Sequence, residues 1–355
     1  MKTGPTCGAG LRMTTERITI LGDGQMGLVC ASVLAQGGPS VEATLWGHEA
    51  GPMEMLRQTR VSPRLPMLRL PEPLRLTADP RVALADADLI ISAVPTQFIR
   101  SVWKRVRVLV PGPTEAAVVS VAKGIEDGTF LRPTQVIADV LGDDPDGPPR
   151  AFAVLSGPTI APELGRCLPA TMIAASDDGG LATRVQRLFS ASWLRIYTGT
   201  DPLGVELAGA TKNVIAIAAG VLDGLQAGFN AKSALLSRGL AEIARLGSAM
   251  GARAETFFGV AGVGDLATSC FSPEGRNRSC GEALGRGEPL SSYLQRTQSV
   301  VEGVATAKAV LGLARKFRVE MPIAEAVHAV LYEGMDPIVA IARLMSREPK
   351  AERVG

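Results

Sequence analysis

The stretch Arg17-Ile-Thr-Ile-Leu21, followed by Gly22-Asp-Gly24-Gln-Met-Gly27 and by Leu28-Val-Cys-Ala-Ser-Val-Leu-Ala35, decides the fold of this chain. A β-branched run, a glycine-rich turn and an apolar helical segment predict a strand, a tight turn and a helix. In that context the glycines make the turn, let backbone approach a pyrophosphate, and let helix pack on strand. The helix N-terminus then offers free N–H groups to the pyrophosphate. The stretch therefore predicts a dinucleotide-binding unit; the alternative is a glycine-rich turn without a ligand.

The rest of the chain extends this pattern. Strand-like runs at residues 41–46, 87–94, 116–121, 151–155, 170–175 and 194–198 are separated by helical segments such as 97–108 and 182–190, and residues 51–80 form a Pro- and Arg-rich stretch. After Asp201-Pro202, the apolar segments 203–225, 233–250, 303–316 and 323–332 have helical spacing, with no strand between them. The sequence predicts an α/β fold: a Rossmann-like, doubly wound and mostly parallel sheet followed by an all-helical C-terminal domain.

These boundaries divide the chain into four expected parts. Residues 1–16 are a loose N-terminal extension, 17–200 the dinucleotide-binding Rossmann-like domain, 201–346 a helical substrate and catalytic domain, and 347–355 a C-terminal tail.

Composition excludes several classes of protein. Of 355 residues, 46% are hydrophobic and 20% charged, and the net charge of +2 gives neither the signature of disorder nor a basic surplus for nucleic acid. The longest apolar run, 214–222, is shorter than the roughly 18 residues that a membrane span needs. The N-terminus lacks the apolar core of a secretory signal, and five scattered cysteines suggest neither disulfides nor zinc. We expect a cytoplasmic protein without a metal.

Histidine and lysine are scarce in this chain. It has two histidines, and only eight of its 37 basic residues are lysines, so Arg is the default cation. A lysine within an apolar segment is then a candidate for proton transfer, because an ammonium can release its proton near neutrality and a guanidinium cannot.

Two lysines meet that description. Lys123 stands at the end of a predicted parallel strand, where open α/β sheets bind ligands. Lys212 lies within an apolar helix, so it must meet an acid, a ligand or a water-filled cleft. The alternatives are a surface charge for Lys123 and a structural ion pair of Lys212 with Glu206 or Asp265.

Loop residues complete the candidate site. The backbone amides of Ser156-Gly157-Pro158-Thr159 and the Thr159 hydroxyl could hold a polar substrate, and Arg276 with Asn277 makes a reasonable phosphate clamp. A solvated surface side chain is the alternative for Arg276. The second strand ends at Trp46-Gly47-His48; an acid there favours NAD and an Arg favours NADP, but His48 favours neither and could be an ordinary surface residue.

Nine separated motifs occur in the order of one known family. They are Gly22-x-Gly24-x-x-Gly27, Leu45-Trp46-Gly47-His48, Ala93-Val94-Pro95, Lys123-Gly124, Ser156-Gly157-Pro158-Thr159, Lys212-Asn213-Val214, Gly264-Asp265-Leu266, Arg276-Asn277 and Val301-Glu302-Gly303. From about residue 18 to 344 the chain resembles the bacterial NAD(P)-dependent glycerol-3-phosphate dehydrogenases. The resemblance implies a cleft between a Rossmann-like and a helical domain, NAD or NADP as cofactor, and hydride transfer between sn-glycerol 3-phosphate and dihydroxyacetone phosphate, which supplies phospholipid synthesis. It also implies a small phosphorylated three-carbon substrate, and we expect a homodimer.

The resemblance also implies roles for individual residues. Lys212 is the proton acceptor or donor at the C2 hydroxyl, with Lys123 and Asp265 beside it as catalytic residues. The implied substrate contacts are Lys123, Gly157, Thr159, Lys212, Asp265, Gly275, Arg276 and Asn277. The implied cofactor contacts are Gly22, Gly24, Gln25, Met26, Gly27, His48, Lys123, Ala161, Arg276, Val300 and Glu302.

Four positions depart from the family's usual pattern. Asp23 stands where a small neutral residue is commoner, Met26 replaces an aromatic residue, Pro162 enters a helix, and Gly275 stands where a Ser usually supplies a hydroxyl. Two alternatives to the implied function are a related two-domain dehydrogenase of another small hydroxy acid and a catalytically silent dinucleotide-binding module.

Overall fold

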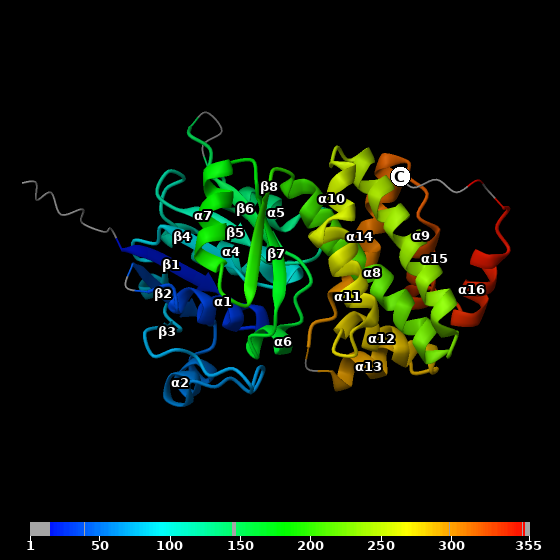
Figure 1. Ribbon diagram of the computed structural model, residues 1–355, viewed down its shortest axis with the longest axis horizontal. Coiled ribbons are helices and arrows are strands. Elements are labelled where there is room, and N and C mark those ends of the chain that lie inside the picture. Colours follow the sequence, from blue (N-terminus) through cyan, green and yellow to red (C-terminus); the bar gives the residue numbers. More distant parts are fainter. Residues whose placement is uncertain (1–14, 39, 144–146, 298, 350, 352–355) are drawn as a thin grey trace, which may run out of the picture.

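An eight-stranded sheet forms the N-terminal part of the computed structural model, which describes residues 15–38, 40–143, 147–297, 299–349 and 351 (Figure 1). Its strands are β1 (Glu16–Leu21), β2 (Val41–Trp46), β3 (Arg75–Thr77), β4 (Leu89–Ser92), β5 (Ala117–Ser120), β6 (Phe152–Ser156), β7 (Ala170–Ser176) and β8 (Leu194–Gly199). Their order is β3-β2-β1-β4-β5-β6-β7-β8, and every neighbouring pair is parallel except β6 with β7. The predicted mostly parallel sheet is confirmed.

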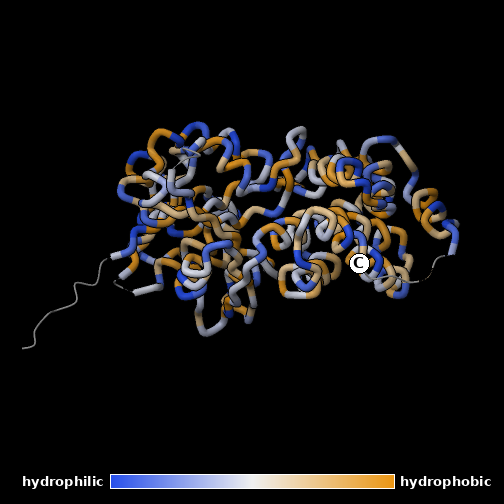
Figure 2. Tube along the Cα trace, turned by 90° about the horizontal axis from the view of Figure 1, so that it is seen from above, coloured by the Kyte–Doolittle hydropathy of each residue, from blue (hydrophilic) through white to orange (hydrophobic). Residues whose placement is uncertain are grey.

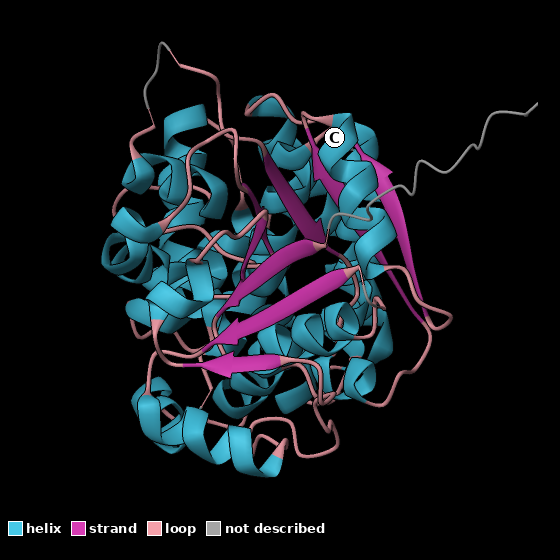
Figure 3. Ribbon diagram, turned by 90° about the vertical axis from the view of Figure 1, so that its left-hand side faces the viewer, coloured by secondary structure: helices cyan, strands magenta, loops and turns pink. Residues whose placement is uncertain are grey.

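Helices cover both faces of this sheet, as Figure 3 shows. They are α1 (Gln25–Ala35), α2 (Ala50–Thr59), α3 (Pro80–Leu84), α4 (Thr96–Val106), α5 (Pro133–Leu141), α6 (Ala161–Gly165) and α7 (Gly179–Phe189), with a 3₁₀ turn at Arg107–Leu109. One core cluster joins the sheet to α1, α6 and α7, and a second joins it to α3, α4 and α5. Because both of its faces are covered, β4 (Leu-Ile-Ile-Ser) is buried throughout and its sequence is a nearly continuous apolar run.

The prediction from the sequence missed or misplaced some elements. Residues 51–80 hold α2 and the short edge strand β3, which the Pro- and Arg-rich composition concealed because β3 has only three residues. The first strand begins at Glu16, inside the expected 1–16 extension, whose residues 1–14 lie outside the described part of the chain. The first helix begins at Gln25, so Gln25 to Gly27 form its first turn and belong to the helix as well as to the glycine-rich motif.

The C-terminal part, at the right of Figure 1, contains helices and no strand among its described residues. Its elements are α8 (Pro202–Gly224), α9 (Gly228–Ala249), α10 (Ala254–Phe258), the π-helical turn η2 (Val260–Gly264), α11 (Asp265–Phe271), α12 (Arg276–Gly285), α13 (Leu290–Arg296), α14 (Glu302–Phe317), α15 (Pro322–Tyr332) and α16 (Pro337–Met345). The short helices α10, α11, α12 and α13 were not predicted, because their polar and glycine-rich stretches carry little apolar periodicity.

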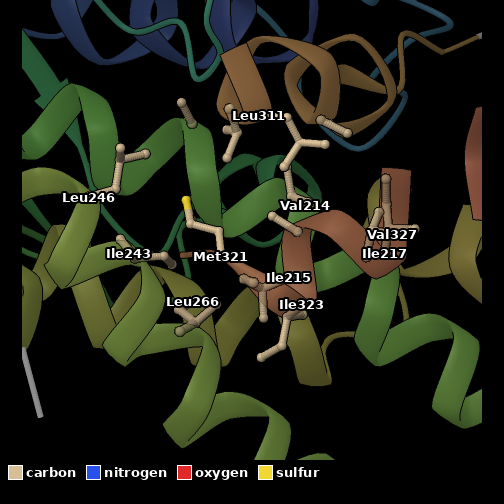
Figure 4. Packing of buried hydrophobic residues seen from close by; sticks show 14 of the residues in the cluster. Val214, Ile215, Ile217, Ile243, Leu246, Leu266, Leu311, Met321, Ile323 and Val327 are labelled. Carbon is tan, nitrogen blue, oxygen red and sulfur yellow. The ribbon is translucent and has the colours of Figure 1, made fainter. Parts of the chain in front are cut away.

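Helix α8 is the centre of the helical core. Figure 4 shows Val214, Ile215 and Ile217 of α8 packed among side chains of α9, α11, α14 and α15. By length and composition α8 could cross a membrane, but 94% of its apolar window is buried inside the protein. It is therefore accounted for as a core helix, and apolar segments run through both halves of the elongated molecule (Figure 2).

Helices α8 and α12 approach one another with their backbones in contact. A Cβ added at Gly281 of α12 would lie 1.9 Å from the carbonyl oxygen of Ile217, and one at Gly220 of α8 would lie 1.9 Å from that of Arg278. Only glycine fits at such a crossing. This contact fixes the start of α12 relative to the middle of α8.

We predict that Gly281→Ala lowers the free energy of unfolding by about 2 kcal/mol or more, because the methyl group forces the two helices apart. Urea unfolding followed by circular dichroism measures the change. Gly179→Ala is the control, since Gly179 lies in α7 with no atom within 4 Å of an added Cβ. Equal stability of the two variants would contradict the close crossing.

Candidate active site

Lys123 lies just beyond the carboxyl end of β5 and turns toward the helical part. Its Nζ donates to the Gly157 carbonyl at 2.8 Å, to the Thr159 hydroxyl at 3.0 Å and to Asp265 Oδ2 at 2.7 Å. Gly157 and Thr159 follow β6, so the ends of two neighbouring parallel strands supply these groups. The Asn213 side chain also donates to the Lys123 carbonyl at 2.9 Å, which holds the backbone of this lysine against α8. Lys123 is thus an interior group and not a surface charge.

Lys212, in the middle of α8, contacts the other oxygen of the same carboxylate. Its Nζ donates to Asp265 Oδ1 and to the Ser269 hydroxyl, the latter at 2.6 Å. Asp265 is only 1% exposed and begins α11 directly after the π-helical turn η2. One buried carboxylate therefore joins two ammonium groups that come from different parts of the chain.

The alternative of a structural ion pair for Lys212 holds in part. Lys212 does pair with Asp265, whereas Glu206 pairs with Arg132 and accepts the backbone and hydroxyl hydrogens of Thr134, at the start of α5. Lys212 also lines the cleft described below, so the ion pair does not exclude contact with a ligand there.

Burial lowers the pKa of Lys212 from its usual value near 10.5 to about 8. The charge of Asp265 opposes this shift, and the nearby positive charge of Lys123 adds to it. An ammonium with a pKa near neutrality can both give and take a proton under ordinary conditions.

A cleft of about 200 Å³ joins these residues to the glycine-rich turn. It is lined by Gly24, Gln25 and Met26 at one end, and by Lys123, Thr159, Lys212, Ser269 and the start of α12 at the other. Ala161, Val300 and Glu302 also line it. Burial raises the pKa of Glu302, which accepts the backbone N–H of Thr96 at 3.3 Å.

The glycine-rich turn has the shape that a dinucleotide requires. Gly22 has φ +112°, and an added Cβ would lie 2.7 Å from the Ala93 carbonyl oxygen. A Cβ on Gly27 would lie 1.9 Å from the Gly22 carbonyl oxygen, so the helix packs directly on the turn. Around Gly24 there is open space, and no side chain caps the first turn of α1. The backbone N–H groups of this first turn are therefore left to bind a ligand, and they fit a pyrophosphate.

The structure brings together most of the predicted site residues. Of the predicted substrate contacts, Lys123, Thr159, Lys212, Gly275, Arg276 and Asn277 line the cleft, and Gly157 and Asp265 hold Lys123 from behind. Of the predicted cofactor contacts, Gly22 and Gly27 shape the turn, and His48 does not line the cleft. His48 is exposed at the end of β2 and pairs with Glu49 at 3.1 Å.

The departures from the family pattern have local explanations. Asp23 pairs with Arg64, with Nη1 and Oδ2 2.7 Å apart. Pro162 is the second residue of α6, where the missing N–H costs nothing. Gly275 stands at the N-cap of α12, and Met26 packs partly against the core of the sheet.

Two residues near the site were not predicted. Ser269 contacts Lys212, and its place four residues after Asp265 on a helix was a usable signal, because positions i and i+4 share a face. Arg64 comes from the Pro- and Arg-rich stretch, where nothing distinguished it from its neighbours.

Two family models match the chain. The model for the N-terminus of the NAD-dependent glycerol-3-phosphate dehydrogenases matches residues 17–182, and the model for their C-terminus matches residues 201–342. The chain belongs to this family. The predicted family, its oxidoreductase class and the NAD or NADP cofactor are confirmed.

Individual relatives agree with this membership. The chain is 43% identical to the NAD(P)+ glycerol-3-phosphate dehydrogenase 2 of Mycobacterium tuberculosis over 345 residues, 97% of this chain and all of that protein. It is equally similar to the Geobacter sulfurreducens glycerol-3-phosphate dehydrogenase, over 96% and 99% of the two chains. The crystal structure of the Coxiella burnetii enzyme superimposes with a TM-score of 0.87 at 34% identity, covering 94% of this chain and 99% of that one.

We predict that Asp265→Asn lowers the pKa of Lys212 below 8, because the charge that opposes burial is removed. The same change lowers the free energy of unfolding by about 3 kcal/mol, since two lysines lose a buried counter-ion. NMR of ¹³C-methylated lysines and thermal unfolding measure the two effects. Ser269→Ala is the control and costs about 1 kcal/mol; an unchanged Lys212 pKa in Asp265→Asn would contradict the shared carboxylate.

Proposed function

We propose that this protein interconverts sn-glycerol 3-phosphate and dihydroxyacetone phosphate, with Lys212 moving the proton of the C2 hydroxyl. The observation that carries the proposal is the Lys212 ammonium, which lines the cleft, is only 7% exposed and has a pKa near 8. A nicotinamide bound in this cleft would supply the hydride transfer to C2 of the ketone, or from C2 of the alcohol.

Lys212 has a different task in each direction. In reduction, protonated Lys212 gives its proton to the carbonyl oxygen as that oxygen gains negative charge. In oxidation, neutral Lys212 takes the hydroxyl proton as the C2–H bond breaks. Asp265 and Ser269 hold Nζ in place through both steps.

Lys123 supports this proton transfer. Its charge lowers the pKa of Lys212 and stabilises negative charge on the reacting oxygen. Its own Nζ is held by Gly157, Thr159 and Asp265, so it is positioned before a substrate enters.

The start of α12 supplies a site for the substrate phosphate. Arg276 is exposed at the cleft and donates to the Val300 carbonyl at 3.3 Å, while Asn277 accepts the Gly303 N–H at 2.9 Å. A guanidinium at a helix N-terminus suits a phosphate group better than it suits a small carboxylate. This pair favours the phosphorylated substrate over another hydroxy acid.

We assign dinucleotide binding to residues 17–200 and proton transfer and phosphate binding to residues 201–346. Gln25, Met26, Ala161, Val300 and Glu302 would contact the cofactor, because all of them line the same cleft as Lys212.

We further propose a cytoplasmic homodimer that supplies glycerol 3-phosphate for phospholipid synthesis, with no nucleic-acid partner and no membrane insertion. Helix α16 exposes Ile338, Val339 and Met345, and residues of α8, α9, α15 and α16 line an apolar cavity of about 970 Å³. Exposed apolar surface of this kind supports a protein partner.

We expect purified protein to oxidise NADH or NADPH when dihydroxyacetone phosphate is added, measured by the loss of absorbance of the reduced cofactor. No turnover with either cofactor would contradict the proposed function.

Arg276→Gln should raise KM for dihydroxyacetone phosphate about tenfold or more, because a charged hydrogen bond to phosphate is lost. Arg286→Gln, at the far end of α12, is the control and leaves KM unchanged. If a small carboxylate substrate were turned over more efficiently than dihydroxyacetone phosphate, the alternative of a dehydrogenase for another small hydroxy acid would be favoured.

We expect opposite pH profiles in the two directions. Reduction needs protonated Lys212, so its kcat/KM falls as pH rises through about 8, and oxidation needs the neutral amine, so its kcat/KM rises over the same range.

Lys212→Met should lower kcat by about 10² or more while the cofactor Kd changes little. Lys104→Met, at an exposed position of α4, is the control. Near-normal kcat in Lys212→Met would refute the proton-transfer role.

A further inference from the structure

The end of β2 and the glycine-rich turn lie side by side. Strands β1 and β2 run parallel with Leu21 opposite Trp46, and the Gly22 N–H donates to the Trp46 carbonyl at 2.9 Å. Asp23 and Gly47, the residues that follow, are therefore neighbours in space. In sheets of this kind the end of β2 carries the acid that reads the adenosine ribose 2′-hydroxyl.

In this protein a side chain at position 47 would have to displace Met53. A Cβ added at Gly47 would lie 2.4 Å from the sulfur of Met53, which is almost fully buried, and 3.1 Å from Cγ of Asp23. The carboxyl group of Asp23 thus stands beside the place of a side chain at the end of β2. Its side chain is 16% exposed, so the carboxylate is partly open to solvent.

The charges around this carboxylate are also fixed. Arg64 donates to Asp23 Oδ2 at 2.7 Å, and the Arg64 carbonyl accepts the Gln25 side chain at 2.8 Å, so its loop is attached to the turn on both sides of Gly24. The adjacent His48 pairs with Glu49. The guanidinium of Arg64 is therefore already bound to a carboxylate.

We propose that Asp23 makes this enzyme select NAD(H) over NADP(H). Its carboxylate accepts a hydrogen bond from the ribose 2′-hydroxyl of NAD(H) and repels the 2′-phosphate of NADP(H). It also engages Arg64, the guanidinium that would otherwise pair with that phosphate. The inference rests on the proposed function only in taking a nicotinamide dinucleotide as the ligand.

Direct binding tests the proposal without turnover. The Kd of NADH and of NADPH is measured by fluorescence titration of the reduced nicotinamide, in the absence of substrate, for wild type and variants. Wild type should bind NADH at least about tenfold more tightly, because bringing like charges together lowers affinity by at least about that factor. Asp23→Asn, which keeps the size of the side chain, should reduce the NADH preference about tenfold, mainly by tightening NADPH.

A second variant separates charge from shape. In Asp23→Asn/Arg64→Gln the gain in NADPH affinity should be lost, because the released guanidinium is gone. Glu49→Gln is the matched control, since it removes a neighbouring carboxylate that pairs with His48 and not with Arg64. Equal wild-type Kd values for NADH and NADPH would overturn the proposal, as would an unchanged ratio in Asp23→Asn or an equal shift in Glu49→Gln.

The two proposals fail separately. If the Kd ratio follows these expectations but dihydroxyacetone phosphate is not reduced, the role of Asp23 stands and the proposed substrate is wrong. If dihydroxyacetone phosphate is reduced but the Kd ratio is flat, the proposed function stands and the role of Asp23 is wrong.

Discussion

A single carboxylate shared by two lysines is the interaction on which the site depends. Burying an ammonium without a partner is costly, and burying two next to each other costs more. Asp265 pairs with both ammonium groups, with one carboxylate oxygen for each lysine. It therefore brings the end of β5, the middle of α8 and the start of α11 together. The remaining imbalance, two positive charges against one negative, helps to keep the pKa of Lys212 low.

Backbone contact between α8 and α12 gives this arrangement its second fixed point. Because Gly220 and Gly281 allow the helices to touch, Arg276 and Asn277 at the start of α12 face the same cleft as Lys212. Side chains of any size at the crossing would move the phosphate-binding end of the site away from its proton donor. The glycines in the helical part are thus as important to the geometry of the site as those in the turn after β1.

The sequence was most informative where local signals are strong. The glycine-rich turn after a β-branched run predicted β1 and α1, and the scarcity of lysine drew attention to Lys123 and Lys212. Edge strand β3 and the short helices α10 to α13 were missed, because elements of this length are stabilised by packing and carry little periodicity of their own. The pairing of Asp23 with Arg64 joins segments about 40 residues apart, so no local pattern could reveal it. Its neighbours in sequence gave only the observation that an acid stood in an unusual place.

The pairing of Glu206 with Arg132 and Thr134 restricts how the molecule can move. Glu206 is fully buried on α8, whereas its partners lie at the start of α5, under the sheet. Separating them would leave a buried charge without a partner, at a cost of about 3 to 5 kcal/mol. A rotation of the helical part against the sheet that opens the cleft would have to keep this pair together. Together with the Lys123–Asp265 pair, which also joins the two halves, this pair ties the helical part to the sheet at two buried points.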